Sequence, residues 1–409
     1  MTNHDHPLSR KNILICVGGG IAAYKVCEVI SQLYKWGVNL EIILTDSAQK
    51  FITPLTLSTL ARKSAYTDRD FWQPVYSRPL HITLGEWADL MVIAPLTANT
   101  LGKLVYGLAD NLLTNTILAS TCPIIVAPAM NTQMWLQKSV QDNWQKLHRD
   151  SRYHLLHTNT GLLACDQVGK GRMAEAKEIL ISIESIISSQ GKRDLVGKNI
   201  LISGGNTREY IDPVRFIGNP ATGKMGIALA NACYYRGGKV TLVAGNINSQ
   251  LLQQLPPIQI ISVTTAEEME SAMMSNFSQA DITYMAAAVA DVKPCNYSSQ
   301  KLSKQSLPSN LKLEQVNDIV AKLGEIKQPT QKLIGFAAQT GDILTPAKEK
   351  LQRKKLDAIV ANPIDKDNAG FATDTNEAIL IDRQEQQTII ETTTKLTLAH
   401  HIINKTLEN

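Results

Sequence analysis

Two short apolar segments each run into a cluster of glycines, and this pattern constrains the fold more than any other feature. The segments are residues 11–16, ahead of glycines 18–20, and residues 198–203, ahead of glycines 204 and 205. A helical segment, a glycine turn and a further β-branched run follow each cluster. Apolar strands that alternate with helices are typical of parallel sheets covered on both faces. We therefore expect two α/β domains with mainly parallel sheets.

The domain boundary is predicted near residue 192. The chain has 409 residues, which suits two or three domains. Residues 188–194 are small and polar, contain a glycine, and follow a segment with helical character, so they are expected to form a linker. The predicted domains are residues 1–191 and 192–409. A second polar stretch, residues 296–310, is expected to be a mobile loop inside the second domain.

Composition and charge exclude several classes of protein. Hydrophobic residues make up 44% of the chain and charged residues 19%, which excludes intrinsic disorder. A net charge of +4 is too small to predict binding to nucleic acid or to a membrane surface. The polar N-terminus and the lack of a long apolar run predict a cytoplasmic protein. The six cysteines form no Cys-x-x-Cys pair, so neither a zinc site nor a disulfide framework is expected.

Two glycine motifs indicate phosphate binding without naming the ligand. Residues 18–23 satisfy the dinucleotide fingerprint G-x-G-x-x-A, and Asp46 then either binds a ribose or caps the next helix. Residues 218–225 match the P-loop pattern except that Met225 stands where Ser or Thr should bind magnesium. No clean strand precedes this second motif, so a true P-loop is not expected. The Gly223-Lys224 pair before a helix could still hold a phosphate in another way.

Polar residues at expected strand ends are candidates for ligand binding. Asn99 and Asn131 follow apolar runs at residues 91–95 and 124–128, and ligands bind at the carboxyl ends of such strands. Each asparagine could instead cap a helix. His81 is either catalytic or structural. Cys165 lies in a charged, glycine-rich segment and is a candidate acid or nucleophile, whereas the other five cysteines are expected to be packing residues.

Several motifs in combination resemble one family. Residues 19–25, His81-Ile82, residues 128–131 with Met134, and residues 164–165 with 171–173 are similar to flavin-dependent cysteine decarboxylases. More closely, they resemble the phosphopantothenoylcysteine decarboxylase half of the bifunctional coenzyme A biosynthesis family. Further motifs resemble the ligase half of that family. They are residues 207–209, 212–215, 219 with 223–226, 286–291, 335–338, and 350 and 354 with 356–357. The resemblance covers nearly the whole chain in the same order.

For the first domain, the resemblance implies a flavodoxin-like, Rossmann-like fold that binds FMN rather than NAD. The family usually has Ser or Thr where this chain has Gly18. His81 would act as a base or orienting group, Asn131 would bind the substrate carboxylate, and Cys165 would protonate the ene-thiolate left after decarboxylation. The residues implied at FMN are Gly19, Gly20, Ile21, Ala22, Thr45, Ser47, Thr97, Asn99 and Thr100.

For the second, Rossmann-like domain, the resemblance implies CTP-dependent ligation of 4′-phosphopantothenate to cysteine. CTP and Mg²⁺ would activate the carboxylate as an acyl-cytidylate, which the cysteine amine then attacks. Asn219 would contact the activated carboxylate, and Lys301 would stabilise negative charge. The residues implied at CTP are Met285, Ala286, Ala287, Asp291, Lys301, Asn317, Asp318, Ile319, Phe336, Lys350 and Lys354. The residues alone leave Lys301 as a surface lysine and Lys350 with Lys354 as a solvated basic face; the magnesium ligands are unknown.

The resemblance also implies a homo-oligomer. Flavin domains of the family form trimers and ligase domains form dimers, so the combined symmetry would close as a dodecamer. Two other functions stay open at this point. One is an NAD-dependent oxidoreductase with a fused domain. The other is an inactive flavin-binding regulatory relative, against which the joint presence of His81, Asn131 and Cys165 argues.

Overall fold

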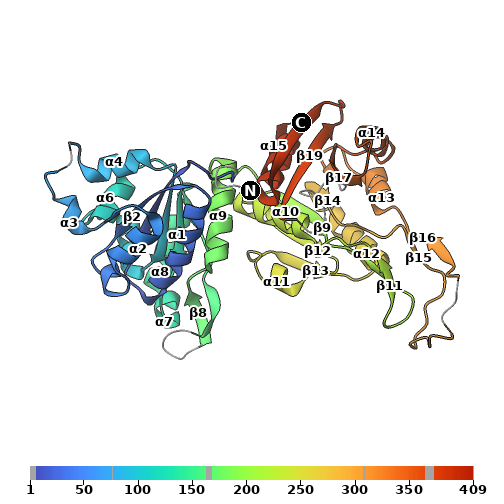
Figure 1. Ribbon diagram of the computed structural model, residues 1–409, viewed down its shortest axis with the longest axis horizontal. Coiled ribbons are helices and arrows are strands. Elements are labelled where there is room, and N and C mark those ends of the chain that lie inside the picture. Colours follow the sequence, from blue (N-terminus) through green and yellow to red (C-terminus); the bar gives the residue numbers. More distant parts are fainter. Residues whose placement is uncertain (1–5, 76, 163–167, 307–309, 364–372, 409) are drawn as a thin grey trace. The chain divides into compact units, whose positions relative to one another are not determined.

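The chain folds into two compact units, Met1–Lys192 and Arg193–Asn409. The computed structural model describes residues 6–75, 77–162, 168–306, 310–363 and 373–408. Figure 1 shows the first unit from blue to green and the second from green to red. Each unit contains one large α/β sheet, and most strand pairs in these two sheets are parallel, which confirms the predicted fold class.

The first unit is built on a six-stranded sheet with the order β3-β2-β1-β4-β5-β6, in which every neighbouring pair is parallel. The strands are β1 (Asn12–Val17), β2 (Asn39–Leu44), β3 (Ala65–Tyr66), β4 (Leu90–Leu96), β5 (Ile124–Pro128) and β6 (Tyr153–Leu155). The chain leaves β1 for β2 on one side and later adds β4 on the other. This reversal creates a switch point between β1 and β4, where ligands of open α/β sheets bind.

Helices cover this sheet because its strands are apolar on both faces. Leu14, Cys16, Met91 and Ile93 belong to a buried cluster together with Leu84 and other helix residues. Their neighbours in the strands, such as Ile13 and Ile15, are equally buried and point to the opposite face. The helices are α1 (Val26–Lys35), α2 (Pro54–Ala61), α3 (Asp68–Phe71), α4 (Leu80–Trp87), α5 (Ala98–Tyr106), α6 (Leu112–Leu118), α7 (Thr132–Leu136), α8 (Lys138–His148) and α9 (Ala176–Ser189), with 3-10 turns η1 (Ile21–Lys25) and η2 (Ala48–Lys50).

The second unit is built on an eight-stranded sheet with the order β13-β12-β9-β14-β17-β18-β19-β20. Pairs from β13 to β18 are parallel, and the last two pairs are antiparallel. The switch point lies between β9 and β14. The strands are β9 (Asn199–Gly204), β12 (Lys239–Ala244), β13 (Gln259–Ser262), β14 (Ile282–Met285), β17 (Lys332–Gln339), β18 (Ala358–Pro363), β19 (Thr375–Asp382) and β20 (Gln387–Thr394).

Helices also cover both faces of this second sheet. Met269, Phe277, Leu323 and Leu351, from three different helices, share one buried cluster with the strand residue Leu201. Another pair, α10 and α15, packs together, and α10 also packs against β9 and β12. The helices are α10 (Lys224–Tyr235), α11 (Ser249–Leu252), α12 (Ala266–Phe277), α13 (Ile319–Ile326), α14 (Leu344–Arg353) and α15 (Lys395–Glu408). Among the helices of the described residues, none is both long and apolar enough to cross a bilayer.

In the part of the chain that the structure describes, three small two-stranded antiparallel sheets lie outside the two large ones. They are β7 (Asn159–Leu162) with β8 (Val168–Arg172), β10 (Arg208–Tyr210) with β11 (Phe216–Gly218), and β15 (Val292–Pro294) with β16 (Leu313–Gln315). The motif at residues 218–225 therefore follows a hairpin strand and not a central strand of the sheet. A P-loop is built on a central strand, so this arrangement agrees with the sequence argument against one.

Candidate active sites

The residues predicted to bind FMN lie at the carboxyl ends of β1, β2 and β4, around the switch point of the first unit. Three loops approach closely there, because a Cβ atom at Gly18 would clash with the Pro95 carbonyl oxygen and one at Gly19 would clash with Ser47. At Gly20, in contrast, a Cβ would find only Pro95 Cγ, at 3.8 Å. The glycines thus bring three strand ends together and leave open space over Gly20. This arrangement fits a ligand that contacts main-chain groups.

Hydroxyl groups at this edge are engaged in local caps. Thr97 Oγ1 accepts a hydrogen bond from Thr100 N at 3.2 Å and caps α5, so Asn99 is not the cap. Thr45 Oγ1 accepts from Ala48 N at 3.2 Å. Asp46 accepts a side-chain bond from Gln49 Nε2 at 3.1 Å and does not cap η2, so of its two alternatives the structure does not support the cap. Main-chain N–H groups, more than free hydroxyls, are left to face a ligand.

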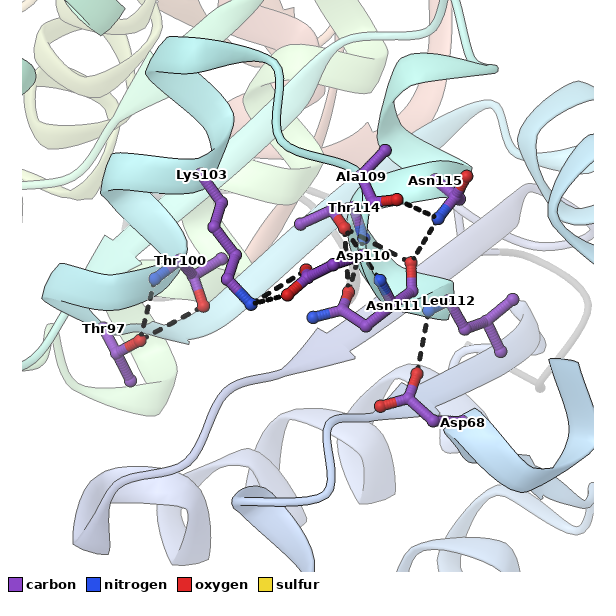
Figure 2. Close-up of polar contacts among 10 residues, drawn as sticks. All are labelled: Asp68, Thr97, Thr100, Lys103, Ala109, Asp110, Asn111, Leu112, Thr114 and Asn115. Carbon is purple, nitrogen blue, oxygen red and sulfur yellow. Dashed lines mark hydrogen bonds and ion pairs between the residues drawn. The ribbon is translucent and has the colours of Figure 1, made fainter.

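A polar network fixes the turn between α5 and α6, close to Thr97 in the chain (Figure 2). Lys103 Nζ contacts both carboxylate oxygens of Asp110, at 2.7 and 2.8 Å. Asn111 caps α6 through a 2.9 Å bond from Thr114 N, and Asp68 accepts from Leu112 N at 2.8 Å. This network was not predicted from the sequence. Its signal was the Asn111-x-x-Thr114 spacing of a cap at a helix start.

Asn131 caps α7, because its Oδ1 accepts from Gln133 N at 2.8 Å. Capping uses the carbonyl oxygen Oδ1, whereas a substrate carboxylate would need the Nδ2 donor, so the two predicted roles use different atoms. The hairpin β7–β8 docks beside it, since Met130 N donates to Gly171 O at 3.0 Å. Gly171 has φ +131°, and a Cβ there would clash with the Met130 carbonyl oxygen. Glycine at 171 therefore lets β8 approach the Asn131 loop.

Of the two remaining decarboxylase candidates, the structure describes His81 but not Cys165. His81 lies on α4, with its ring edge-on to Phe71 at 5.3 Å between centroids. Its Nδ1 is buried and has no hydrogen-bond partner, although buried polar atoms normally have one. Cys165 lies in residues 163–167, outside the described part of the chain.

The other cysteines are free thiols. Burial raises the pKa of the Cys16 and Cys233 thiols far above the ordinary range, so neither is an active nucleophile. These two are packing residues, as expected. Cys295 is exposed, so the expectation that it packs in the interior is wrong.

The second unit has a cavity of about 720 Å³ at the carboxyl edge of its sheet. Asn219 lines it, together with nine of the residues predicted to bind CTP. These are Met285, Ala286, Ala287, Asp291, Asn317, Asp318, Ile319, Phe336 and Lys354. They come from the ends of β14 and β17, from the start of α13 and from the end of α14, so the fold brings together residues far apart in sequence.

Buried polar side chains hold the loops that form this cavity. Ala287 N donates to Ser203 Oγ at 3.2 Å, and Asn219 Nδ2 donates to Val289 O at 3.2 Å. Asn206, only 8% exposed, donates through Nδ2 to the carbonyl oxygen of Asn219 at 2.5 Å and to that of Ala221 at 3.1 Å. Asn206 thus positions the Asn219 loop. Asn206 was not predicted from the sequence, since one asparagine beside a glycine carries no periodic signal.

Charged groups line the same cavity. Lys354 Nζ lies 2.9 Å from Asp318, whose Oδ1 also caps α13 by accepting from Ala321 N. Burial alone would raise the pKa of Asp318, but the bonds from Lys354 and Ala321 outweigh it and lower that pKa. Burial, followed by repulsion from Lys354, lowers the pKa of Lys350. Lys354 is 16% exposed, so a solvated basic face does not describe this pair.

Lys301 and Lys350 do not line the cavity. Lys350 lies near enough to Asp291 to sense its charge, whereas Lys301 is exposed. The segment around Lys301 is tethered, because Leu302 N donates to the buried carboxylate of Asp212 at 3.2 Å. Arg215 pairs with the same carboxylate at 2.7 Å. In the described residues, no three His, Cys, Asp or Glu side chains gather as a metal site would require.

Comparison with known proteins decides the family. Residues 1–188 match the family model "Flavoprotein", and residues 195–409 match "DNA/pantothenate metabolism flavoprotein C-terminal domain". The coenzyme A biosynthesis bifunctional protein CoaBC of Bacillus subtilis is 40% identical over 97% of both chains. The chain belongs to this family. A cysteine/cysteine sulfinic acid decarboxylase from an unknown prokaryote is 42% identical over 87% of this chain and 99% of its own length.

A crystal structure of the C-terminal domain of a CoaBC protein is 32% identical to this chain. It covers 52% of this chain and 96% of its own, with a TM-score of 0.44. The CoaBC family expected from the sequence motifs is confirmed by the matches over both units, and with it a bifunctional enzyme of coenzyme A biosynthesis that combines a decarboxylase with a ligase. A flavoprotein match on the first unit favours flavin over the NAD alternative.

Proposed function

We propose that the second unit ligates 4′-phosphopantothenate to cysteine with CTP and that the first unit decarboxylates the product with FMN. The observation that carries this proposal is the CoaBC match across 97% of the chain, which spans both units. The cavity of the second unit supports the ligase half, because it gathers nine predicted nucleotide contacts around Asn219. The convergence of three strand ends at glycines 18–20 supports the flavin half.

In the ligase reaction, the carboxylate of 4′-phosphopantothenate attacks the α-phosphorus of CTP and pyrophosphate leaves. The cysteine amine then attacks the acyl-cytidylate and CMP leaves. Asn219 holds the carboxylate, with its loop fixed by Asn206. Lys354 faces the nucleotide phosphates, with Lys350 and the exposed Lys301 completing the positive charge as ligand binds. Mg²⁺ enters with the nucleotide phosphates.

In the decarboxylase reaction, FMN supplies the electron sink that a carboxylate leaving from cysteine requires. Gly19, Gly20, Ile21 and Ala22 offer main-chain groups to it, and the ends of β2 and β4 add Thr45, Ser47, Thr97, Asn99 and Thr100. Asn131 Nδ2 binds the substrate carboxylate. His81, on α4, orients the substrate or accepts its proton. Cys165 donates the final proton.

A coupled assay tests the proposal. Purified protein should carry bound flavin, and with 4′-phosphopantothenate, cysteine, CTP and Mg²⁺ it should release both CMP and CO₂. When CTP is omitted and phosphopantothenoylcysteine is supplied, CO₂ should appear without CMP. Absence of CMP in the full mixture contradicts the ligase half, and absence of CO₂ with the supplied intermediate contradicts the decarboxylase half.

The cellular setting and assembly belong to the same proposal. The relatives are bacterial biosynthetic enzymes, and the enzyme acts in the cytoplasm. Trimeric flavin units joined to dimeric ligase units give a closed dodecamer. Light scattering of the full chain measures its mass, and a monomer would contradict this assembly.

A further inference from the structure

The ligase cavity is also lined by residues not assigned to the nucleotide, among them the first residues of two helices. Asn376 of β19 lines the cavity, and the neighbouring Thr375 pairs with Thr394 at the end of β20. Helix α15 begins directly afterwards at Lys395. Helix α10, which packs against α15, begins at Lys224. Both lysines line the cavity.

We propose that Lys395 and Lys224 form a phosphate-binding subsite at this end of the cavity, which holds a phosphate group of one of the two phosphorylated ligase substrates. This inference rests on the proposed ligase function. The two possible sources are the 4′-phosphate monoester of the acid and the triphosphate of the nucleotide. Both present a phosphate dianion to the same pair of lysines.

Lys395 is buried to an extent that is rare for lysine. Its side chain is 6% exposed, and Nζ donates to the Thr373 carbonyl oxygen at 2.6 Å. Burial, followed by repulsion from Lys224, lowers the pKa of Lys395 to about 8, and Asp374 acts in the opposite direction. A buried cation beside a second cation is unfavourable in the free protein. A bound phosphate would offset both charges.

The carboxylate in this cluster does not neutralise it strongly. Asp374 lies 2.7 Å from Lys224 Nζ, but its side chain is 90% exposed. Ion pairs that open to solvent contribute little and give way readily to another anion. Two lysines and one exposed carboxylate therefore leave a net positive end to the cavity.

A buried amide and a helix terminus point to a ligand at the same place. Asn376 is 6% exposed, lines the cavity, and has a buried Oδ1 with no hydrogen-bond partner. Helix α10 has no side-chain cap at Gly223, and neither α10 nor α15 has an acidic residue in its first turn. Helix N-termini favour anions. A ligand with a hydroxyl or N–H group near its phosphate would satisfy Asn376 as well.

The test measures binding to the full-length protein by calorimetry, without turnover. The variant Lys395→Met keeps the aliphatic stem and removes the charge. Lys405→Met is the matched control, because it lies on the same helix, is 38% exposed and pairs with Glu408 at 2.6 Å. The probes are CTP with Mg²⁺, inorganic pyrophosphate, 4′-phosphopantothenate, and pantothenate, which lacks the phosphate.

We expect Lys395→Met to weaken the Kd of a phosphorylated probe by about tenfold or more, as loss of a charged hydrogen bond does. The Kd of pantothenate should stay within about twofold, and Lys405→Met should match the wild type throughout. Weaker binding of CTP and pyrophosphate assigns the subsite to the triphosphate. Weaker binding of 4′-phosphopantothenate alone assigns it to the monoester.

Unchanged Kd values for all phosphorylated probes, in a Lys395→Met protein that melts like the wild type, would overturn the proposal. If Lys395→Met does not fold, Lys224→Met decides the question by the same measurements. The subsite and the ligase function fail separately. Lys395-dependent phosphate binding without CMP formation by the wild type would keep the subsite and remove the ligase function. Normal ligation by the wild type, together with phosphate binding that does not depend on Lys395, would keep the ligase function and remove the subsite.

Discussion

The two units end their central strands in the same way but fill the resulting edge differently. In the first unit, glycines bring the ends of β1, β2 and β4 into contact, and the hydroxyls of Thr45 and Thr97 are used in caps. In the second, long charged side chains such as Lys354 and Lys395 line a cavity of about 720 Å³. One topology thus supports two kinds of recognition. The first should be sensitive to added volume and the second to removed charge.

The largest expected effect concerns the proton donor of the first unit. Cys165→Ser should lower the rate of 4′-phosphopantetheine formation by about 100-fold or more, because a general acid contributes that much. Turnover should stall at the oxidised, decarboxylated intermediate, while CMP formation continues. Mass spectrometry of the products checks this. Normal 4′-phosphopantetheine formation by the variant would exclude Cys165 as the acid.

Removal of one cavity charge should weaken the second site next. Lys354→Met should raise the KM for CTP by about tenfold to 100-fold. The variant lacks the charged contact to phosphate and leaves the Asp318 carboxylate without its ion-pair partner. Lys348→Met is the control, because Lys348 pairs with Glu385 and does not line the cavity. Steady-state kinetics of CMP release measure both. Equal KM values for the two variants would contradict a contact between Lys354 and the nucleotide phosphates.

Added volume should harm the first unit more than the second. Gly19→Ala should destabilise the protein by about 1–3 kcal/mol and lower its flavin content, because the new Cβ meets the side chain and main chain of Ser47. Gly102→Ala in α5 is the control, where the nearest atom to a Cβ is Asn143 Nδ2 at 3.9 Å. There alanine should stabilise the helix by up to about 1 kcal/mol. Thermal melts and flavin absorbance separate the two, and a stable, flavin-loaded Gly19→Ala protein would contradict the steric account.

The positioning role of Asn206 predicts a smaller effect. Asn206→Ala leaves the carbonyl oxygens of Asn219 and Ala221 without their donor, and the ligase kcat should fall by about tenfold. Asn276→Ala is the control. It removes a hydrogen bond from the Asn276 side-chain amide to a carbonyl oxygen within α12, and it should leave kcat unchanged. The decarboxylase rate with supplied phosphopantothenoylcysteine serves as an internal reference. Loss of both activities together would indicate unfolding in place of mispositioning.

The smallest effect is a pH dependence of phosphate binding. A folded pKa of about 8 for Lys395 means that it is mostly charged at pH 7 and mostly neutral at pH 9. Affinity for the phosphorylated probe should therefore fall a few-fold between these values, with Lys224 and Asp374 as the charges that face it. A bound phosphate raises the pKa of Lys395 and so limits the decrease in affinity. Calorimetry at both pH values should show a flatter profile for Lys395→Met, and an equal slope would assign the titration to another group.

The sequence predicted the central strands well because their signal is local. Apolar runs that enter glycine clusters marked β1 and β9 to within about one residue. The antiparallel strands β19 and β20 were not predicted, since their partners are fixed only when the sheet assembles. Motif resemblance found Asn219 and Lys354, which line one cavity. Asn206 and Lys395 were missed because their roles arise from contacts between distant segments.

The central claim is that one chain carries two separable reactions, one in each unit. The most direct measurement follows CMP and 4′-phosphopantetheine in parallel from 4′-phosphopantothenate, cysteine and CTP, for wild type, Cys165→Ser and Asn219→Ala. We expect both products from wild type, CMP without 4′-phosphopantetheine from Cys165→Ser, and neither from Asn219→Ala. Supplied phosphopantothenoylcysteine should restore 4′-phosphopantetheine formation in Asn219→Ala. Failure of that restoration in a folded, flavin-loaded protein would contradict the separation of the two sites.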